Sequence, residues 1–528
     1  MPHPGILIIH LHAHLPYVRH PEHDKFLEED WLFEAMSETY IPILASLIRL
    51  REEGIRFRLS LTLSPPLCEM FADELLMNRY RARLGHLIEL GQQEILRTRS
   101  SPEMNKVAIF HLNFFQEVAE FFDKCSGRML PLFKTLQDSG HLEILTCGAT
   151  HGFLPLVHTT NGVRAQLRVA RKNYQKHFGK PPRGIWLPEC AYYDGLDRLL
   201  AQEGYSYSFL EAHGLLFGQP CPTRGIWGPI VSRHGVHFLG RDVESSKQVW
   251  SAKEGYPGEG SYREFYRDLG YDGDEATVRP YMHGGGVRHN LGYKYFRITG
   301  SKVDLSEKKI YDPDAAAQTA KSHAGNFHFN RSGQFDHLNS IIGTTPVVLA
   351  PYDAELFGHW WFEGPWFLEH FMRMCAKHTD HFVLGTAPEA IEICGAEPCE
   401  PSPSSWGDGG YYNVWLNESN QWMYPHLAEA EEIMISAASA QHSDAGHMRV
   451  VKQMARELLL AQSSDWAFIA STGTTVPYAV RRFRLHIDNF QRLRRMLADN
   501  SINESELSSI ESRDSIFAEM DPTVYRES

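Results

Sequence analysis

Short, unbroken apolar runs recur along the first two thirds of the chain, and segments with a helical period separate most of them. The first run is GILII at residues 5–9. A parallel strand that is covered on both faces has this pattern, because neither face is left to the solvent. Similar runs follow at 57–63, 142–146, 184–187, 205–210, 237–240 and 347–350. About seven strands in such an alternation predict a parallel α/β barrel.

The pattern changes beyond residue 395. The segment EPCEPSPS at 397–404 is typical of a linker. From about 413 to 500 the apolar positions follow a helical period, which predicts a mainly helical C-terminal domain. The polar residues after Ser501 are expected to be loosely held. We therefore divide the chain into a barrel at 1–395 and a helical domain at 396–528.

Acidic and histidine side chains directly follow several of the apolar runs. In an α/β barrel the loops after the strands meet at one rim, and that rim carries the active site. The repetition of this placement from strand to strand predicts a catalytic rim. The residues concerned are His12, His14, His151, Glu189, Glu211, His213, Asp242 and Asp353.

Three histidines, His10, His12 and His14, alternate after the first run and share one face if the strand continues. Such a set could hold a metal ion. A metal-dependent deacetylase on a related barrel typically has an Asp close to this strand end, and the motif here offers none. We therefore favour hydrogen bonds from these rings to a substrate or to a catalytic carboxylate.

The stretch after the last run, APYDAELFGHWWFEGPWFLEHF at 350–371, combines carboxylates with aromatic rings. Tryptophan faces cover the apolar faces of sugar rings, and carboxyl groups do acid, base and nucleophile chemistry at glycosidic bonds. Asp353 and Glu355 are candidate acids, and Trp360 is a candidate wall of the cleft. The other interpretation is a loop packed on tryptophans, which are large and usually buried. This stretch by itself leaves both interpretations open.

Composition narrows the function class. The net charge of -13 and the pI of about 6.1 do not favour nucleic acid or an anionic membrane, whereas a neutral glucan fits an acidic protein. Single, scattered cysteines indicate reduced thiols in a cytoplasmic protein. The N-terminus is predicted to be a strand rather than a signal peptide, and no stretch is apolar enough for a membrane span. Gly284–Gly286 have no strand-to-helix frame, so we do not interpret them as a phosphate loop.

Several long and unusual motifs occur along nearly the whole chain. They are HLHAHLPYVRHP, THGF, WLPECAYY, PYDAELFGHWWFEGP, SWGDGGYYNVWLN and SSDWAF. Together they resemble glycoside hydrolase family 57, and within it the α-1,4-glucan branching enzymes that carry a helical C-terminal domain. The resemblance implies a distorted (β/α)7 barrel with a small insertion and an all-α C-terminal domain, and it implies no metal and no cofactor.

The resemblance also implies a retaining double displacement with Glu189 as the nucleophile and Asp353 as the acid/base. Asp353 is then expected to start protonated, with a pKa raised by the aromatic wall and by the charge of Glu189. The family's substrate-contacting positions correspond to His12, His14, His151, Trp250, Trp406, Trp415 and Asp465. Trp406 and Trp415 are expected to bring part of an acceptor groove from the helical domain.

A mobile loop with a Tyr at its tip closes over the site in members of this family. The comparable stretch here lies in a small inserted lid region at about 190–235, with Trp227 in place of the Tyr. The stretch after Tyr193 also lacks the long insertion that many members have. A shorter, altered lid is expected to admit more water and to favour hydrolysis.

The implied function is branching of α-glucans such as amylose and glycogen by a monomer, with no nucleic-acid or membrane partner. An α-glucan hydrolase or a 4-α-glucanotransferase on the same scaffold is the first alternative. A catalytically silent glucan-binding protein would require a damaged acid pair, and both acids are present. A metal-dependent deacetylase is the remaining alternative.

Overall fold

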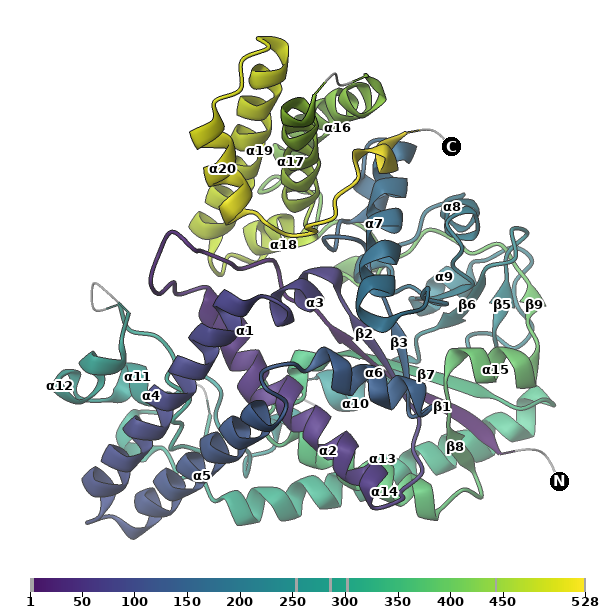
Figure 1. Cartoon of the computed structure of the whole chain (residues 1–528). Coiled ribbons are helices and arrows are strands. Elements are labelled where there is room, and N and C mark those ends of the chain that lie inside the picture. The colour runs from purple at the N-terminus through teal and green to yellow at the C-terminus, as the bar shows by residue number, and fades with distance from the viewer. Residues whose placement is uncertain (1–3, 252–254, 284–286, 301–302, 442–443, 527–528) are drawn as a thin grey trace.

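The computed structural model describes residues 4–251, 255–283, 287–300, 303–441 and 444–526, so Gly284–Gly286 lie outside the described residues. Its centre is a parallel barrel (Figure 1). Within the described residues the barrel consists of β1 (Gly5–Ala13), β2 (Leu59–Leu63), β3 (Leu142–Leu145), the segment 184–185, β4 (Tyr207–Leu210), β6 (His237–Gly240) and β7 (Val347–Asp353). These are the runs that the apolar pattern predicted.

Single parallel bridges close the barrel where regular strand pairing stops. Strands β3, β2, β1 and β7 are hydrogen-bonded in that order, and β4 pairs with β6. The bridge Thr146↔Ile185 joins β3 to the fourth segment, and Gly184↔Tyr207 joins that segment to β4. The bridge Arg241↔Leu349 then joins the end of β6 to β7. The (β/α)7 architecture expected from the resemblance is therefore confirmed, in the distorted form.

The register of β1 places the functional side chains at one end of the barrel. His12 is opposite Asp353 on β7 and opposite Thr62 on β2. All nine residues of β1 are buried, as the unbroken apolar pattern predicted for its first part. His12 and Asp353 therefore lie side by side at the C-terminal ends of the strands.

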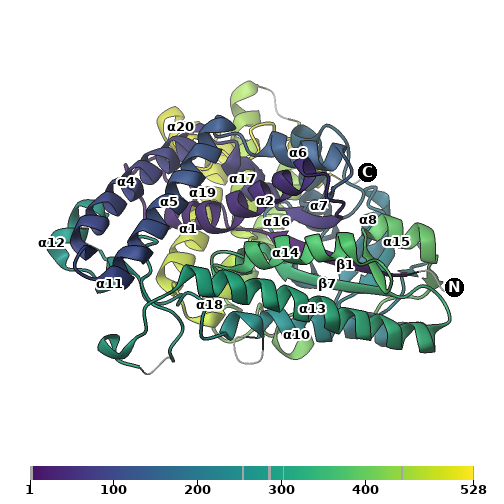
Figure 2. The same cartoon turned by 90° about the horizontal axis from the view of Figure 1, so that it is seen from below.

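Helices cover the outside of the barrel. In the first half of the chain they are α1 (Glu29–Ala35), a π-helical turn (Met36–Tyr40), α2 (Ile41–Glu52), α3 (Pro65–Phe71), α4 (Glu74–Thr98), α5 (Pro102–Lys124), α6 (Leu130–Asp138), α7 (Thr160–Phe178), α8 (Leu196–Gln202) and α9 (Ala212–Leu216). Among the described residues, six more helices follow between β6 and the C-terminal domain: α10 (Val243–Trp250), α11 (Leu269–Asp272), α12 (Glu275–Val278), α13 (Pro313–Ile342), α14 (Gly364–Lys377) and α15 (Ala387–Cys394). Helices α13 and α14 run side by side under β7 and β1 (Figure 2).

Shorter strands complete the sheets. β8 (Phe382–Leu384) pairs with the start of β1. β5 (Ile230–Val231) pairs with β6 and also with β9 (Glu397–Pro398). The predicted linker therefore begins as a strand that is attached to the barrel.

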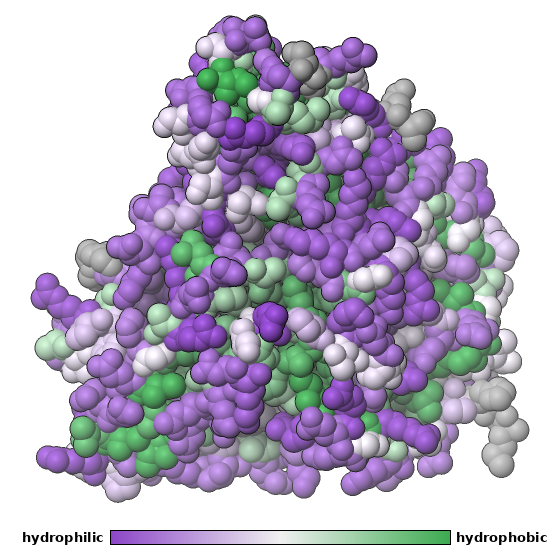
Figure 3. Space-filling view, in the orientation of Figure 1, coloured by the Kyte–Doolittle hydropathy of each residue, from purple (hydrophilic) through white to green (hydrophobic). Residues whose placement is uncertain are grey.

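The last part of the chain is helical, as predicted. It contains α16 (Met423–Ser439), α17 (Ala445–Ala461), α18 (Ser464–Thr472), α19 (Val476–Ala498) and α20 (Glu504–Arg513), which gather at the top of Figure 1. Helix α18 is the one that faces the ends of the barrel strands, because Ser464 donates its backbone N–H to the carbonyl of His151 over 3.1 Å. The face in Figure 3 is mainly hydrophilic, with apolar residues in small groups. No helix in the described ranges has the length and apolar character needed to cross a bilayer.

The expectation of a loosely held tail after Ser501 is wrong. Arg19 donates a hydrogen bond to the carbonyl of Ser512, and Arg168 donates to the carbonyls of Val524 and Arg526. Val524 and Tyr525 are buried. Apolar residues among the polar ones thus anchor the tail against α7.

The lid expected at about 190–235 is not an insertion over the strand ends. This segment contains β4, which is itself a strand of the barrel. The carbonyl of Trp227 accepts a hydrogen bond from the N–H of Val347, the first residue of β7. Asp353 is the last residue of that strand, about 20 Å away at ~3.3 Å per residue. Trp227 is therefore not placed to close over Asp353.

Candidate active site

A cleft of about 590 Å³ lies at the C-terminal ends of the barrel strands and beneath α18. Glu189 and Asp353 both line it, and so do most of the predicted binding residues. They are His12, His14, His151, Trp250, Trp406, Trp415 and Asp465. The structure thus brings together side chains from the two ends of the sequence, although nothing in their spacing indicates contact.

Glu189 is held in an unusual backbone conformation. Its φ of 63° lies in the left-handed region, and Cys190 follows at 52°. His151, on the neighbouring loop, has a φ of 57°. Non-glycine residues in this region carry strain of the order of 1–3 kcal/mol and cluster at functional sites. The tight turn directs the Glu189 side chain into the cleft rather than along the barrel wall.

Trp406 fixes the Glu189 carboxylate. Its indole N–H donates to Glu189 Oε2 over 2.7 Å, and its backbone N–H donates to the Glu189 carbonyl over 3.0 Å. A hydroxyl hydrogen bond from Ser464 also favours the charged carboxylate. These donors, together with the 15% exposure of the side chain, leave Glu189 oriented and reachable.

Burial raises the pKa of both candidate acids. For Glu189 the charges of Asp353 and Asp465 add to the effect, while the Trp406 and Ser464 donors oppose it. For Asp353 the neighbouring His14 and Arg241 oppose it. Two carboxyls in one desolvated cleft do not both ionise readily. Burial raises the pKa of Glu189 to about 8 and that of Asp353 to about 7, so the two carboxyls hold one proton between them, and the Trp406 and Ser464 donors fix the position of the Glu189 oxygens.

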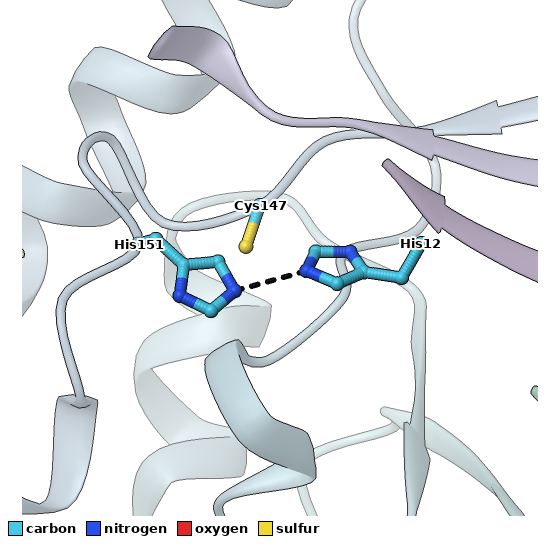
Figure 4. Close-up of side chains that lie close together, drawn as sticks. All are labelled: His12, Cys147 and His151. Atoms are coloured by element: carbon cyan, nitrogen blue, oxygen red, sulfur yellow. Dashed lines mark hydrogen bonds between the residues drawn. The ribbon is translucent and has the colours of Figure 1, made fainter. Parts of the chain in front are cut away.

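Histidines form the floor of the cleft. His12 Nε2 and His151 Nε2 point toward each other at 2.9 Å, so one ring donates and the other accepts (Figure 4). Burial lowers the pKa of both rings well below the usual value, so both are neutral. The ring of His14 stacks on that of His151 with centroids 3.9 Å apart. Below them, Trp186 stacks on His12 at 4.8 Å.

Asp465 comes from α18 and completes this layer. Its Oδ2 lies 3.1 Å from Nε2 of His14. Burial acts to raise the pKa of Asp465, but the contacts with His14, His151 and the hydroxyl of Ser463 outweigh it and hold the pKa at about 2. Asp465 is therefore a buried, ionised partner of His14, not a helix cap.

Two groups at this site resemble metal ligand sets. One is His12, Cys147 and His151, and the other is His14, His151 and Asp465. In the first group the two Nε2 atoms are bonded to each other, and burial keeps the Cys147 thiol protonated by raising its pKa well above the usual value. In the second group His14 Nε2 lies 3.1 Å from Asp465 Oδ2, within hydrogen-bond distance. In both groups, candidate ligand atoms are therefore bonded to one another.

The four predicted tryptophans differ in what they offer to a ligand. Trp250 is 37% exposed and makes an edge contact with Trp406, at a centroid distance of 6.4 Å. Trp360 is 52% exposed and lies further along the groove. Trp415 is only 1% exposed and stacks on Phe153 at 4.5 Å. Its ring supports the cleft wall and is not available as a stacking surface for a sugar.

Three other residues that were predicted for the catalytic rim contact protein groups instead of lining the cleft. Glu211 forms an ion pair with Arg241 at 2.9 Å. Asp242 caps α10 through the N–H of Ser245. His213 Nε2 lies 2.8 Å from the carbonyl oxygen of Gly410.

Glu355, the second acid of the Trp-rich stretch, organises the end of β1. It accepts hydrogen bonds from the backbone N–H of His14, over 3.1 Å, and from the hydroxyl of Tyr40 in the π-helical turn. Burial and the neighbouring Asp353 raise its pKa to about 8. These contacts tie Glu355 to the end of β1, which suits a supporting role.

Three residues of the site are absent from the sequence-based prediction: Ser464, Trp186 and Arg241. Arg241 lines the cleft with its guanidinium 5.6 Å from the Trp406 ring centre. Each of these residues acts through a neighbour distant in sequence. The SSDWAF motif was the available signal for Ser464, because it places a hydroxyl next to Asp465.

The comparisons with known proteins agree with this arrangement. The family described as "Glycosyl hydrolase family 57" matches residues 8–269, and "1,4-alpha-glucan branching enzyme, C-terminal" matches residues 426–525. The 1,4-alpha-glucan branching enzyme TK1436 of Thermococcus kodakarensis is 32% identical over 97% of this chain and 77% of its own length. The chain belongs to glycosyl hydrolase family 57.

Two solved structures superpose over nearly the whole chain. The alpha-amylase AmyC from Thermotoga maritima is 44% identical, with a TM-score of 0.93 and coverage of 99% of each chain. The branching enzyme from Pyrococcus horikoshii is 32% identical, with a TM-score of 0.89 and coverage of 99% of this chain and 97% of its own. Family 57 membership therefore agrees with the resemblance carried by the motifs.

Proposed function

We propose that this protein is a 1,4-alpha-glucan branching enzyme that works by a retaining double displacement. One observation carries the proposal: Glu189 and Asp353 line one desolvated cleft, and Glu189 alone of the two accepts the indole N–H of Trp406. That asymmetry supports Glu189 as the nucleophile and Asp353 as the acid/base. The match of residues 426–525 to the C-terminal part of branching enzymes supports the choice of reaction.

In the first step the Glu189 carboxylate attacks the anomeric carbon of the donor chain, and Asp353 gives its proton to the leaving 4-oxygen. The α-1,4 bond breaks and a glycosyl ester forms on Glu189. In the second step Asp353 takes the proton of an acceptor 6-hydroxyl, whose oxygen attacks the same carbon and displaces Glu189. Two inversions leave the new α-1,6 bond with retained configuration.

Histidines and Asp465 are proposed to bind the donor sugar at the cleavage point. His12 and His151 are neutral and are bonded to each other through their Nε2 atoms, so they form the floor of the donor site, and a sugar hydroxyl that bonds either Nε2 must replace that bond. Trp250 offers an exposed ring for stacking. We propose further that residues 1–395 and 396–528 both build this cleft, since Ser464 and Asp465 contact the barrel histidines.

The test is product analysis on amylose. After incubation with the protein, debranching by an α-1,6-specific enzyme should release short chains, and proton spectra should show new α-1,6 signals. Only new reducing ends, or only rearranged α-1,4 chains, would reject branching. Activity that survives exhaustive chelation is expected, and its loss would revive the deacetylase alternative.

An α-glucan hydrolase is the second candidate. The observation in its favour is the 44% identity to AmyC, which is described as an alpha-amylase. The same Glu189 ester would then be transferred to water. The ratio of reducing ends to α-1,6 bonds in the amylose experiment separates the two activities. An α-glucan substrate, a monomeric state and a cytoplasmic location belong to the proposal.

A further inference from the structure

The groove does not end at Asp353. A second arm of about 870 Å³ shares His14, Trp250, Asp353 and Glu355 with the first cleft and continues from there. It is lined by the long segment that connects β6 to β7, called the excursion below, and by the loop after β7. The lining residues that matter here are Glu264, Phe265, Tyr266, Arg267, Lys308 and Trp360.

Aromatic rings form a platform in this second arm. Phe265 and Trp360 are stacked, with centroids 4.3 Å apart and planes at 23°. Trp360 is 52% exposed and Tyr266 is 75% exposed. Tyr266 meets Phe265 edge-on at 5.1 Å. Exposed rings of this size, in a groove that is continuous with a catalytic cleft, suit the apolar faces of sugar rings.

Buried contacts hold the platform in place. The His359 ring packs edge-on against Phe265 at 5.2 Å, and its Nδ1 lies 3.0 Å from Glu38 in the π-helical turn. Glu38 also pairs with Arg263 at 2.7 Å, with both side chains at least 95% buried. On the excursion, the ammonium group of Lys294 lies 5.2 Å from the centre of the Phe265 ring. The rings are thus preorganised, which reduces the entropy lost on binding.

The two arms differ in which catalytic residue they contain. Glu189 and Trp406 line only the first arm, whereas Asp353 lines both. In a double displacement the sugar bonded to the nucleophile belongs to the donor, and the leaving or accepting sugar lies beyond the acid/base. The second arm therefore lies on the acceptor side. Trp406, bonded to Glu189, lies on the donor side, contrary to the acceptor role expected for it.

We propose that Phe265, Tyr266 and Trp360 bind the acceptor α-glucan chain. The polar residues that border the same arm are paired within the protein, Glu264 with Lys308 and Arg267 with Asp272, so the exposed rings are its main surface for a ligand. This inference rests on the proposed transglycosylation, because a hydrolase needs no acceptor chain. It names the site that selects a glucan hydroxyl over water.

The experiment separates donor from acceptor binding. α-Maltosyl fluoride is the donor, because its fluoride leaving group occupies no sugar site beyond Asp353, and maltopentaose is the acceptor. Fluoride release is measured with and without maltopentaose for the wild type, Phe265→Ala, Tyr266→Ala and Trp360→Ala. Without acceptor, rates should stay within about twofold of the wild type. The maltopentaose concentration that gives half-maximal transfer should rise at least about fivefold, as expected from losing one stacked ring.

Phe329→Ala is the matched control, because Phe329 is 75% exposed on α13 and lines neither arm. It should change neither quantity. Unchanged acceptor dependence in all three variants, or an equal loss of fluoride release without acceptor, would overturn the assignment. Failure of the proposed branching has a different signature: the wild type would transfer to maltopentaose without making α-1,6 bonds, and the three variants would still test the acceptor arm.

Discussion

The hydrogen bond from Trp406 to Glu189 can be removed without removing the ring. The substitution Trp406→Phe deletes the indole N–H that lies 2.7 Å from Glu189 Oε2 and keeps an aromatic face in the cleft. A hydrogen bond to a charged group contributes about 1.5–3 kcal/mol. Because this bond stabilises the ionised carboxylate, its loss should raise the pKa of Glu189 by about 1–2 units.

The direction in which the pH profile should move follows from the role of Glu189. Only the ionised form attacks, so the acidic limb of the kcat/KM profile reports its pKa. In Trp406→Phe this limb should move to higher pH by about 1–2 units, and on the limb kcat/KM should fall about 10- to 100-fold. With α-maltosyl fluoride Asp353 should set no basic limb, because fluoride leaves without a proton. A second donor, Ser464, remains in the variant.

The assay is kcat/KM for α-maltosyl fluoride across the pH range in which the protein stays folded. Trp250→Phe is the control, since it removes an indole N–H from the same cleft at a ring that touches Trp406 only by its edge. Its acidic limb should stay in place. An unmoved acidic limb in Trp406→Phe, with intact folding, would refute the assignment of Glu189 as the ionised nucleophile.

Further predictions concern the acid, the hydrogen bond at α18 and the loop after β7. Asp353→Asn should lower kcat/KM on amylose about 10²- to 10⁴-fold. The kcat/KM for α-maltosyl fluoride should fall less, because fluoride leaves without a proton in the first step. Equal losses of kcat/KM on both donors would contradict the acid role. Asp465 has a depressed pKa of about 2, so its ionised form stabilises the fold above pH ~4, and this stabilisation is lost as the pH falls toward 2. In urea unfolding, the free energy of unfolding of the wild type should fall by about 2 kcal/mol more than that of Asp465→Asn between pH 5 and 2. The same pH dependence of this free energy in both proteins would disprove the prediction. Gly358 has a φ of +126°, and an added Cβ would lie 1.9 Å from the Glu38 carbonyl oxygen, so Gly358→Ala should destabilise by at least about 2 kcal/mol. The open helical position Gly333 is the control, where Ala should stabilise by about 0.5–1 kcal/mol in the same unfolding assay.

The barrel was predictable because each strand is covered on both faces, which leaves an unbroken apolar run in the sequence. The rim position of Glu189 and Asp353 followed from those strands. The closure of the barrel was not predictable, since at 184–185 and at Arg241 it consists of single bridges with no pattern of their own. The hydrogen bond between His14 and Asp465 joins residues 451 positions apart, and no local spacing encodes it.

The wrong expectations have physical reasons as well. Trp227 was assigned to a lid by analogy with a loop, but a backbone hydrogen bond to Val347 ties it to the far end of β7. The resemblance places Trp415 among the substrate contacts, but a motif match says nothing of the Phe153 ring that stacks on it. Only the fold places Phe265 and Tyr266 beside Trp360.

The contact of Ser464 and Asp465 with the barrel histidines has a consequence for the life of the chain in the cell. Synthesis proceeds from the N-terminus, so the barrel, with both carboxyls, emerges before α18 exists. Until α18 docks, His14 lacks its carboxylate and Glu189 lacks the Ser464 donor. The cleft is therefore complete only when the last part of the chain to be synthesised has docked against the barrel.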